Sequence, residues 1–175
     1  MIDTSTLSSA PAVRSRSESR LAIWELLRDP GPARQGLVAH EQAPRLYGPV
    51  KLSNELAHRI IKAGIPSKAL GPLGEFLGLG KGVIADYLDL DRGTALRRVA
   101  KDQLLPTHAA EGLLRLLELD QVAQDTFETE AEALQWLREP HALLDGETPF
   151  EAAKTSFGAQ RVKDMLLAIQ YGGVV

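Results

Sequence analysis

Four polar residues recur at helical spacing in one short stretch of the sequence, and their chemistry suits DNA. They are Thr94, Arg97, Arg98 and Lys101, at relative positions 0, 3, 4 and 7. This spacing places them on one face of a helix expected over 92–103, while Leu96, Val99 and Ala100 fall on the opposite side. Guanidinium and ammonium groups pair with guanine edges or with phosphates, so the stretch predicts a DNA-contacting helix.

The neighbouring elements place this helix in a helix-turn-helix arrangement. We expect a short amphipathic helix over 81–88, a turn at 89–91, and an N-cap at Asp91. In this arrangement the second helix enters the major groove. The expected DNA-binding residues are Thr94, Arg97 and Arg98 at base edges and Arg92 and Lys101 at phosphates. The alternative is an ordinary solvated face of a surface helix.

Other residues that could support catalysis or bind a metal do not form a recognisable site. The chain has no cysteine, which excludes disulfides, thiol catalysis and zinc fingers. The four histidines, His40, His58, His108 and His141, have no metal-ligand spacing. The glycine-rich run 78–82 lacks the preceding strand and the spacing of a nucleotide-binding loop. We therefore expect no enzyme activity, no catalytic residue, no metal and no cofactor.

The charge is unevenly distributed along the 175 residues. The formal net charge of −3 speaks mildly against nucleic acid when taken for the whole chain. Residues 1–106, however, hold 15 Lys and Arg against 11 Asp and Glu, a net charge of +4, whereas residues 107–175 hold 5 against 12, a net charge of −7. This asymmetry predicts two partners of different sign, with DNA at the basic part and a protein at the acidic part.

The pattern along the chain predicts an all-α protein with four regions. Residues 1–19 are rich in Ser and Thr and are expected to form a disordered tail. Residues 20–49 are expected to contain a helix over 20–29 and a connector, 50–106 the helix-turn-helix domain, and 107–175 a second helical domain. No run of 18 apolar residues is present, so we expect no membrane span. We expect a cytoplasmic protein, because the chain has no cysteine and no basic start followed by an apolar core.

Helix boundaries in the second half follow from capping residues and breakers. We expect a long helix over 107–126 and a helix that begins at Thr129 or Glu130. The run Thr148-Pro149-Phe150-Glu151 is a capping box with proline at the first helical position. In the first half, Ser67 is expected to cap a segment with an irregular start at Gly71-Pro72. Gly158 is expected to break the chain before a last helix over 159–171.

The C-terminal residues carry a resemblance to a known family. The stretch 131–144 resembles a "WL…P…aL" segment through Trp136, Leu137 and Pro140, and 145–153 resembles "gG.tPlela". Phe157-Gly158 and the apolar residues of 162–172 follow in the same order. This series is similar to the toxin-binding domain of Xre/MbcA/ParS-type antitoxins, and 77–106 is similar to their Xre-like helix-turn-helix. The resemblance covers about 65–175.

The resemblance implies the antitoxin of a type II toxin–antitoxin pair. The usual partner in this family is a RES-domain toxin that depletes NAD⁺, and the antitoxin's extreme C-terminus enters the toxin's substrate cleft. The corresponding residues here are Tyr171, Gly172, Gly173, Val174 and Val175. The family also implies repression of the protein's own promoter, usually as a homodimer. Gly71-Pro72 and Gly93 depart from the family pattern, and Gly93 costs the recognition helix about 1 kcal/mol relative to alanine.

Two other functions stay open at this point. The first is a stand-alone helix-turn-helix transcriptional regulator with an acidic oligomerisation domain. The second is a centromere-binding partition protein, which shares this domain. A neighbouring gene for a RES-like protein would favour the antitoxin over the regulator.

Overall fold

The structure is a computed structural model that describes residues 15–28 and 52–172. Within these residues all regular elements are helices, and one isolated antiparallel bridge joins Pro66 and Leu104. The predicted all-α class is therefore confirmed. No helix in the described ranges has the length and apolar character needed to cross a membrane. The connector expected over 33–49 and the first 14 residues of the expected tail lie outside the described residues.

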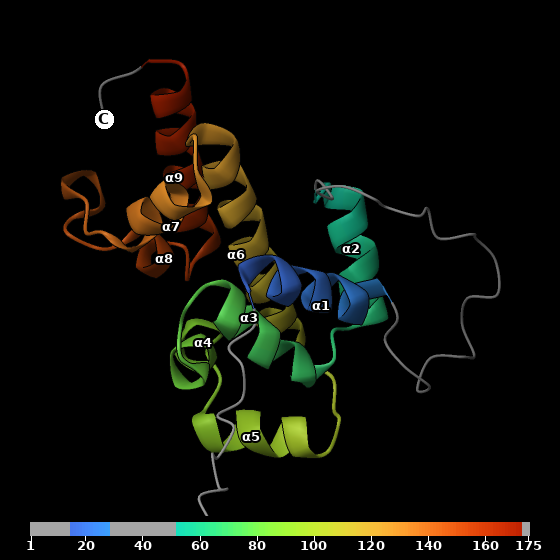
Figure 1. Cartoon of the computed structure of the whole chain (residues 1–175). Coiled ribbons are helices and arrows are strands. Elements are labelled where there is room, and N and C mark those ends of the chain that lie inside the picture. Colours follow the sequence, from blue (N-terminus) through green and yellow to red (C-terminus); the bar gives the residue numbers. More distant parts are fainter. Residues whose placement is uncertain (1–14, 29–51, 173–175) are drawn as a thin grey trace, which may run out of the picture.

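The helices fall into a group before residue 106 and a group after it (Figure 1). The first group comprises α1 (Arg16–Arg28), α2 (Asn54–Ala63), the 3-10 helix η2 (Ser67–Ala69), α3 (Leu70–Phe76), α4 (Lys81–Tyr87) and α5 (Arg92–Ala100). The second comprises α6 (Thr107–Thr126), α7 (Glu130–Arg138), the 3-10 helix η3 (Ala142–Leu144), α8 (Pro149–Ala152) and α9 (Ser156–Gln170). In Figure 1, α5 lies at the bottom of the molecule and α9 near its top.

Side-chain caps start several of these helices where the sequence predicted them. The Asp91 carboxylate accepts a hydrogen bond from the Thr94 amide at 2.8 Å. Thr129 and Thr148 each form a capping box with the glutamate three residues later. These bonds satisfy amides that have no partner inside the helix. The predicted starts of α5, α7 and α8, and both ends of α6, are confirmed.

Helix α1 begins at Arg16, so the prediction that residues 16–19 belong to a disordered tail is wrong. The Arg16 guanidinium reaches three other helices. Nε donates to the Phe76 carbonyl at 3.2 Å, Nη1 donates to the Glu130 carbonyl at 3.1 Å, and Nη2 forms an ion pair with Asp120. These partners lie 60 to 114 residues away in the sequence. A prediction from local composition could not include these distant contacts, so it did not place the first turn of α1 in the helix.

The start of α3 is irregular as predicted, but its cap differs. The Ser67 hydroxyl is buried and has no hydrogen-bond partner, so the prediction that Ser67 caps this segment is wrong. Its backbone amide donates instead to the Gln103 carbonyl at 2.8 Å, and the Leu105 amide donates to the Ile65 carbonyl at 2.7 Å. These two bonds tie the segment after α5 to the start of η2.

Helix α6 is shared by both groups of helices. It packs against α2 on one side and against α7 and α9 on the other. A methyl group at Gly112 of α6 would lie 2.8 Å from Leu88 Cδ2, so the side chain that follows α4 sits directly against this helix. The buried apolar residues form one continuous cluster from Ile23 to Leu166. The domain boundary expected at 106/107 stays a prediction, and it falls at the start of this shared helix.

Helix α9 begins at Ser156, so the prediction that Gly158 breaks the chain is wrong. The Thr155 hydroxyl caps the helix by accepting from the Gly158 amide at 3.0 Å. A Cβ atom at Gly158 would lie 1.9 Å from the carbonyl oxygen of Ala152. Glycine is thus required here because α8 and α9 approach closely at this position, and it does not end a helix.

We expect Gly158→Ala to lower the free energy of unfolding by about 1–3 kcal/mol, as overpacking against a backbone atom does. Urea denaturation of the full chain measures this change. Gly71→Ala is the matched control, because a Cβ atom there meets no heavy atom within 4 Å. Alanine also favours a helix over glycine by about 1 kcal/mol, so this control should unfold at equal or higher urea concentration. Equal loss of stability in both variants would contradict the packing argument.

The buried carboxyl of Asp120 gives a second prediction, for the dependence of stability on pH. Burial raises the pKa of Asp120 from its ordinary 3.8 to about 6, although Arg16 and Arg20 act in the opposite direction. The folded chain therefore holds this proton more tightly than the unfolded chain between these two values. The stability contributed by the protonated carboxyl is fully present below about pH 4 and is lost as the pH rises through 6.

The matched comparison is between the wild type and Asp120→Asn, which cannot titrate at this position. We expect the wild type to lose stability relative to the variant as the pH rises from 4 to 7. Urea denaturation of both proteins at intermediate pH values measures the difference. A difference that stays flat would show that Asp120 keeps an ordinary pKa, and one that grows in favour of the wild type would show that folding lowers this pKa; either result would contradict the prediction.

Candidate functional site

Helix α5 lies at one end of the molecule, and its main packing contacts are with elements of the first group of helices. It packs against α4 and η2, with Ala95 buried at the contact. Arg92 at its first position forms a 3.0 Å ion pair with Asp86 of α4. This hydrogen bond raises the pKa of Arg92 above its ordinary value. The arrangement is a short helix, a turn over 88–91 and a second short helix whose outer side faces solvent (Figure 1).

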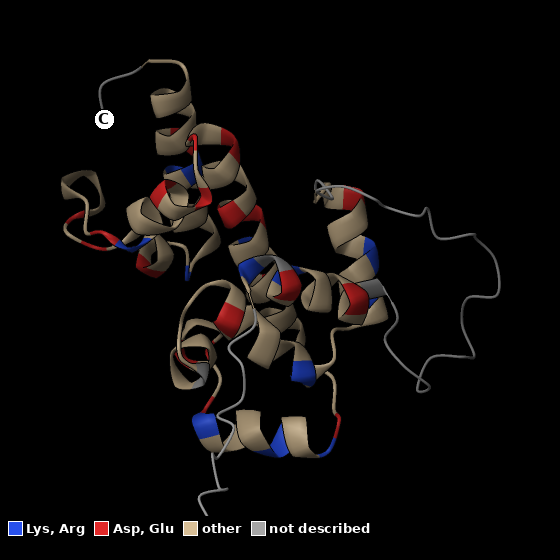
Figure 2. Ribbon diagram, viewed as in Figure 1, with Lys and Arg blue, Asp and Glu red and all other residues tan. Residues whose placement is uncertain are grey.

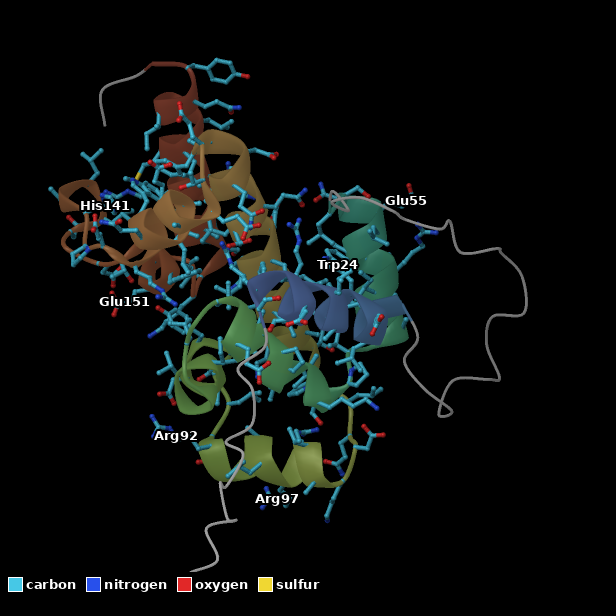
Figure 3. The ribbon with its side chains drawn as sticks, viewed as in Figure 1. Trp24, Glu55, Arg92, Arg97, His141 and Glu151 are labelled. Carbon is cyan, nitrogen blue, oxygen red and sulfur yellow. The ribbon has the colours of Figure 1, made fainter. Side chains whose placement is uncertain are left out.

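The outer side of α5 carries cations that are open to solvent. Arg97 is exposed, and Figure 3 shows its side chain pointing away from the body of the molecule. Its Nη2 donates to the Thr94 hydroxyl at 3.1 Å, which joins two of the predicted DNA-binding residues. Lys101, the residue that follows α5, is also exposed. The structure thus presents Arg97 and Lys101 to a partner, while Arg92 is exposed but paired with Asp86.

The predicted apolar face of α5 is not its buried side. Leu96, which lies on this face, is 68% exposed. Arg98 is half-buried, and its Nη1 donates to the Leu104 carbonyl at 3.1 Å. The contact with α4 and η2 selects the side of the small residue Ala95, because a methyl side chain permits close approach. The helix is rotated accordingly, so Arg98 supports the fold of the following segment and Leu96 joins the outer side.

Acidic residues restrict the positive charge to the outer side of α5. Asp89 and Asp91 precede the helix, and Asp102 follows it and pairs with Lys68 at 3.4 Å. Figure 2 shows Lys and Arg along α5 with Asp and Glu at both of its ends. The pKa of Asp91 lies below its ordinary value because the Thr94 amide donates to its carboxylate. Asp91 is therefore ionised as a cap near pH 7, and the net positive charge of this end is small.

Side-chain contacts connect the α4–α5 end to the acidic part of the chain, residues 107–175. The ring of Tyr87 on α4 meets Phe150 on α8 edge to face, with 6.1 Å between ring centroids. Lys154 Nζ lies 5.1 Å from the centroid of the Tyr87 ring. Burial raises the pKa of Tyr87, so its hydroxyl is neutral near pH 7. On α7, Arg138 donates to the Leu77 carbonyl at the end of α3.

The other predicted site lies at the opposite end, after α9. Tyr171 caps the helix and is 83% exposed, and Gly172 has φ of +76°, a conformation suited to glycine. The remaining residues predicted to bind the toxin, Gly173, Val174 and Val175, lie outside the described residues. The described part of the tail is thus a solvent-exposed aromatic side chain followed by a glycine turn.

Residue types suited to metal binding do not cluster in the ranges that the structure describes, where no group of three or more could hold an ion. The His141 imidazole stacks on Trp136 with 4.6 Å between ring centroids, and its Nε2 lies 3.1 Å from the Trp136 carbonyl oxygen. Trp136 also packs against Phe127 at 5.8 Å and against the core. The rings of Trp136 and His141 are therefore structural.

The sequence prediction missed several exposed apolar residues at this end. Between residues 122 and 172 the exposed large apolar side chains are Leu143, Phe157, Leu167 and Tyr171. Only Tyr171 was predicted as a binding residue. Phe157 was missed because the last helix was expected to begin at 159. If Thr155 had been recognised as the N-cap of this helix, the helical period would have placed Phe157 on the solvent-exposed side.

Comparison with known proteins identifies the acidic half. Residues 122–172, from the last turn and a half of α6 to Gly172, match the family described as the antitoxin Xre/MbcA/ParS C-terminal toxin-binding domain. The chain is also 29% identical over 122 residues to the Prs ADP-ribosylating antitoxin of Sphingobium sp. (strain YBL2). This alignment covers 65% of the chain and 77% of the relative.

The fold and these matches define a helical protein with an antitoxin's toxin-binding domain. The resemblance predicted from the C-terminal motifs is confirmed: residues 122–172 are similar to the toxin-binding domain of Xre/MbcA/ParS-type antitoxins, and the chain is similar to a further antitoxin. The matched region begins inside α6, 15 residues after the start of the second helical domain that the sequence predicted over 107–175. It contains all of α7, α8 and α9, as well as the exposed Tyr171.

Proposed function

We propose that this protein is a cytoplasmic, non-enzymatic antitoxin that neutralises a RES-domain toxin and represses its own promoter as a homodimer. The toxin consumes NAD⁺, and the residues after α9 block its active site. The observation that carries the proposal is the match of 122–172 to a toxin-binding domain. The toxin binds at the α9 end of the molecule, and DNA binds at the α5 end.

The chemistry of the partner is supported by the name of the Sphingobium relative, which associates an antitoxin with ADP-ribosylation. ADP-ribosylation takes ADP-ribose from NAD⁺, so it belongs to the same class of chemistry as NAD⁺ consumption. We assign this chemistry to the toxin and not to the antitoxin, because neither end of the described structure brings a nucleophile, a base and an orienting group together. Incubation of the purified chain with NAD⁺ should accordingly leave the NAD⁺ concentration unchanged.

Exposure and position support the role of the tail. Tyr171 and Gly172 stand clear of the core at the end of α9, and the sequence continues with Gly173, Val174 and Val175. Glycines after an exposed aromatic residue leave the backbone free to follow the wall of a cleft. The tail is thus suited to enter the NAD⁺ site of a toxin that the rest of the domain holds in place.

Deletion of residues 171–175 should abolish protection while leaving the complex with the toxin detectable. The test co-expresses this variant with the product of the adjacent gene, which is expected to be the RES-domain toxin, and measures growth, NAD⁺ concentration and co-purification. A deletion of residues 1–14 is the matched truncation and should protect like the full chain. Full protection by the 171–175 deletion would contradict active-site blocking but not toxin binding.

The α5 end supports DNA binding through its exposed cations. Arg97 points away from the molecule at the end opposite α9 (Figure 3). Lys101 is also exposed, whereas Arg98 donates a hydrogen bond to the Leu104 carbonyl. A guanidinium that reaches a guanine edge contributes about 1–3 kcal/mol of discrimination, and each phosphate contact adds to the salt dependence of binding. We therefore narrow the predicted contact residues on α5 to Arg97 and Lys101, with Thr94 orienting Arg97.

Replacing Arg97 and Lys101 together by alanine should weaken binding to the protein's own promoter DNA about tenfold or more, with unchanged thermal stability. A gel-shift titration at several salt concentrations should also give a shallower salt dependence. The matched control removes one arginine and one lysine from α2, Arg59→Ala with Lys62→Ala, and should bind DNA like the wild type. Equal loss in both double variants would show that only the total charge matters.

A further inference from the structure

One side of α9 is solvent-exposed and carries aromatic residues at both of its ends. Its exposed residues recur at spacings of 3 and 4, which keeps them on one side of a helix. They are Phe157, Gln160, Arg161, Asp164, Leu167 and Tyr171, and we call this surface the α9 outer face. Phe157 is 89% exposed, Tyr171 83% and Leu167 43%. Such exposure of large apolar side chains on one element marks an interaction surface.

The rest of α9 is fixed, so this face is presented on a rigid support. The opposite side of the helix buries Ala159, Val162, Met165 and Leu166 in the core. At its start the Thr155 cap and the close approach of Gly158 to Ala152 hold the first turn in place, next to Phe157. A helix backbone that is already ordered loses little conformational entropy when a partner covers it, which favours tight binding.

We infer that the α9 outer face is the surface on which the toxin docks, and that it anchors the tail in the toxin's cleft. This inference rests on the proposed function and adds to it the surface, beyond the tail, that provides affinity. The face lies inside the matched toxin-binding domain, and three of the four exposed large apolar residues of that domain lie on it. Exposed aromatic residues are frequent anchors of protein interfaces.

The face also continues into the tail. Phe157 and Tyr171 are 14 residues apart, which corresponds to about 21 Å along a helix. Tyr171 ends the face and directly precedes the residues that are proposed to block the toxin. A toxin surface that covers this length would therefore hold the tail at its active site.

The charge at the middle of the face defines the chemistry of the toxin surface. Asp164 accepts a hydrogen bond from Gln160 at 2.8 Å, and among the described residues no Lys or Arg forms an ion pair with it. The neighbouring Arg161 turns instead toward Asp145, at 3.4 Å, and the Leu143 carbonyl. A complementary toxin surface therefore has a basic side chain between two apolar recesses.

This charge argues against a second copy of the chain on the same face. Asp164 lies at the midpoint between Phe157 and Tyr171. Two α9 helices that packed antiparallel about a two-fold axis, with each Phe157 opposite the other Tyr171, would bring the two Asp164 carboxylates together. Like charges in apposition oppose binding, whereas a lysine or arginine of the toxin would pair with Asp164.

The test uses isothermal titration calorimetry to measure binding of the full chain to the product of the adjacent gene, which is expected to be the RES-domain toxin. We expect Phe157→Ala to raise the Kd at least about tenfold, as loss of an aromatic anchor does. Asp164→Lys should weaken binding more than Asp164→Asn, because reversal adds repulsion to the loss of attraction. Leu96→Ala is the matched control: it also removes an exposed apolar side chain, but from α5, and should change the Kd less than twofold.

Each outcome separates this inference from the function on which it rests. If the wild-type chain fails to bind the RES-domain protein, the proposed function is wrong, and this toxin is not the partner that binds the α9 outer face. If the wild type binds and Phe157→Ala and Asp164→Lys bind equally well, with unchanged thermal unfolding, the α9 outer face is not the docking surface and the antitoxin function stands. If these variants instead change only the oligomeric state in light scattering, the face joins two copies of the chain.

Discussion

The buried contact between Arg16 and Asp120 is the interaction on which the arrangement of the helices depends. It joins α1 to α6, and the same guanidinium reaches the end of α3 and the start of α7. The side chain of Asp120 is 2% exposed and that of Arg16 is 17% exposed, so water compensates the carboxylate hardly at all. Removing one partner of a buried pair typically costs about 3–5 kcal/mol, because the other charge stays buried. Four helices from distant parts of the sequence thus meet at one side chain, and α1 acts as a strap across both halves of the molecule.

The contact between Arg16 and Asp120 links the two groups of helices, whose outer ends are proposed to bind different partners. The α5 end is connected to the rest through Leu88 against Gly112 and through Tyr87 against Phe150, and the α9 end through the core of α6. The low net charge of the chain reflects this division, because its basic half carries the surface proposed for DNA and its acidic half carries the toxin-binding domain. The proposed partners would bind at opposite ends of the molecule (Figure 1), so that they do not compete for space.

The sequence predicted those features that depend on neighbours a few residues away. The all-α class, the bounds of α6 and the caps at Asp91, Thr129 and Thr148 follow from helical period and hydrogen bonds over three residues. The features that it missed depend on distant contacts. The first turn of α1 forms because of Asp120 and Phe76, α5 is rotated because Ala95 faces α4 and η2, and Gly158 is a packing residue because of Ala152. The predicted site was affected in the same way: Leu96 and Arg98 exchanged their expected environments, and Phe157 was not recognised.

The close approach at Gly158 also has an evolutionary consequence. The glycine is fixed by a backbone oxygen and cannot be replaced without moving α8, whereas Phe157, its direct neighbour, contacts almost nothing within the chain. Selection on the fold and selection on the partner therefore act on adjacent but separate positions. Related antitoxins could change their toxin by exchanging side chains on the exposed side of this helix while the scaffold beneath it stays the same. Several antitoxin–toxin pairs in one cell could in this way remain insulated from one another.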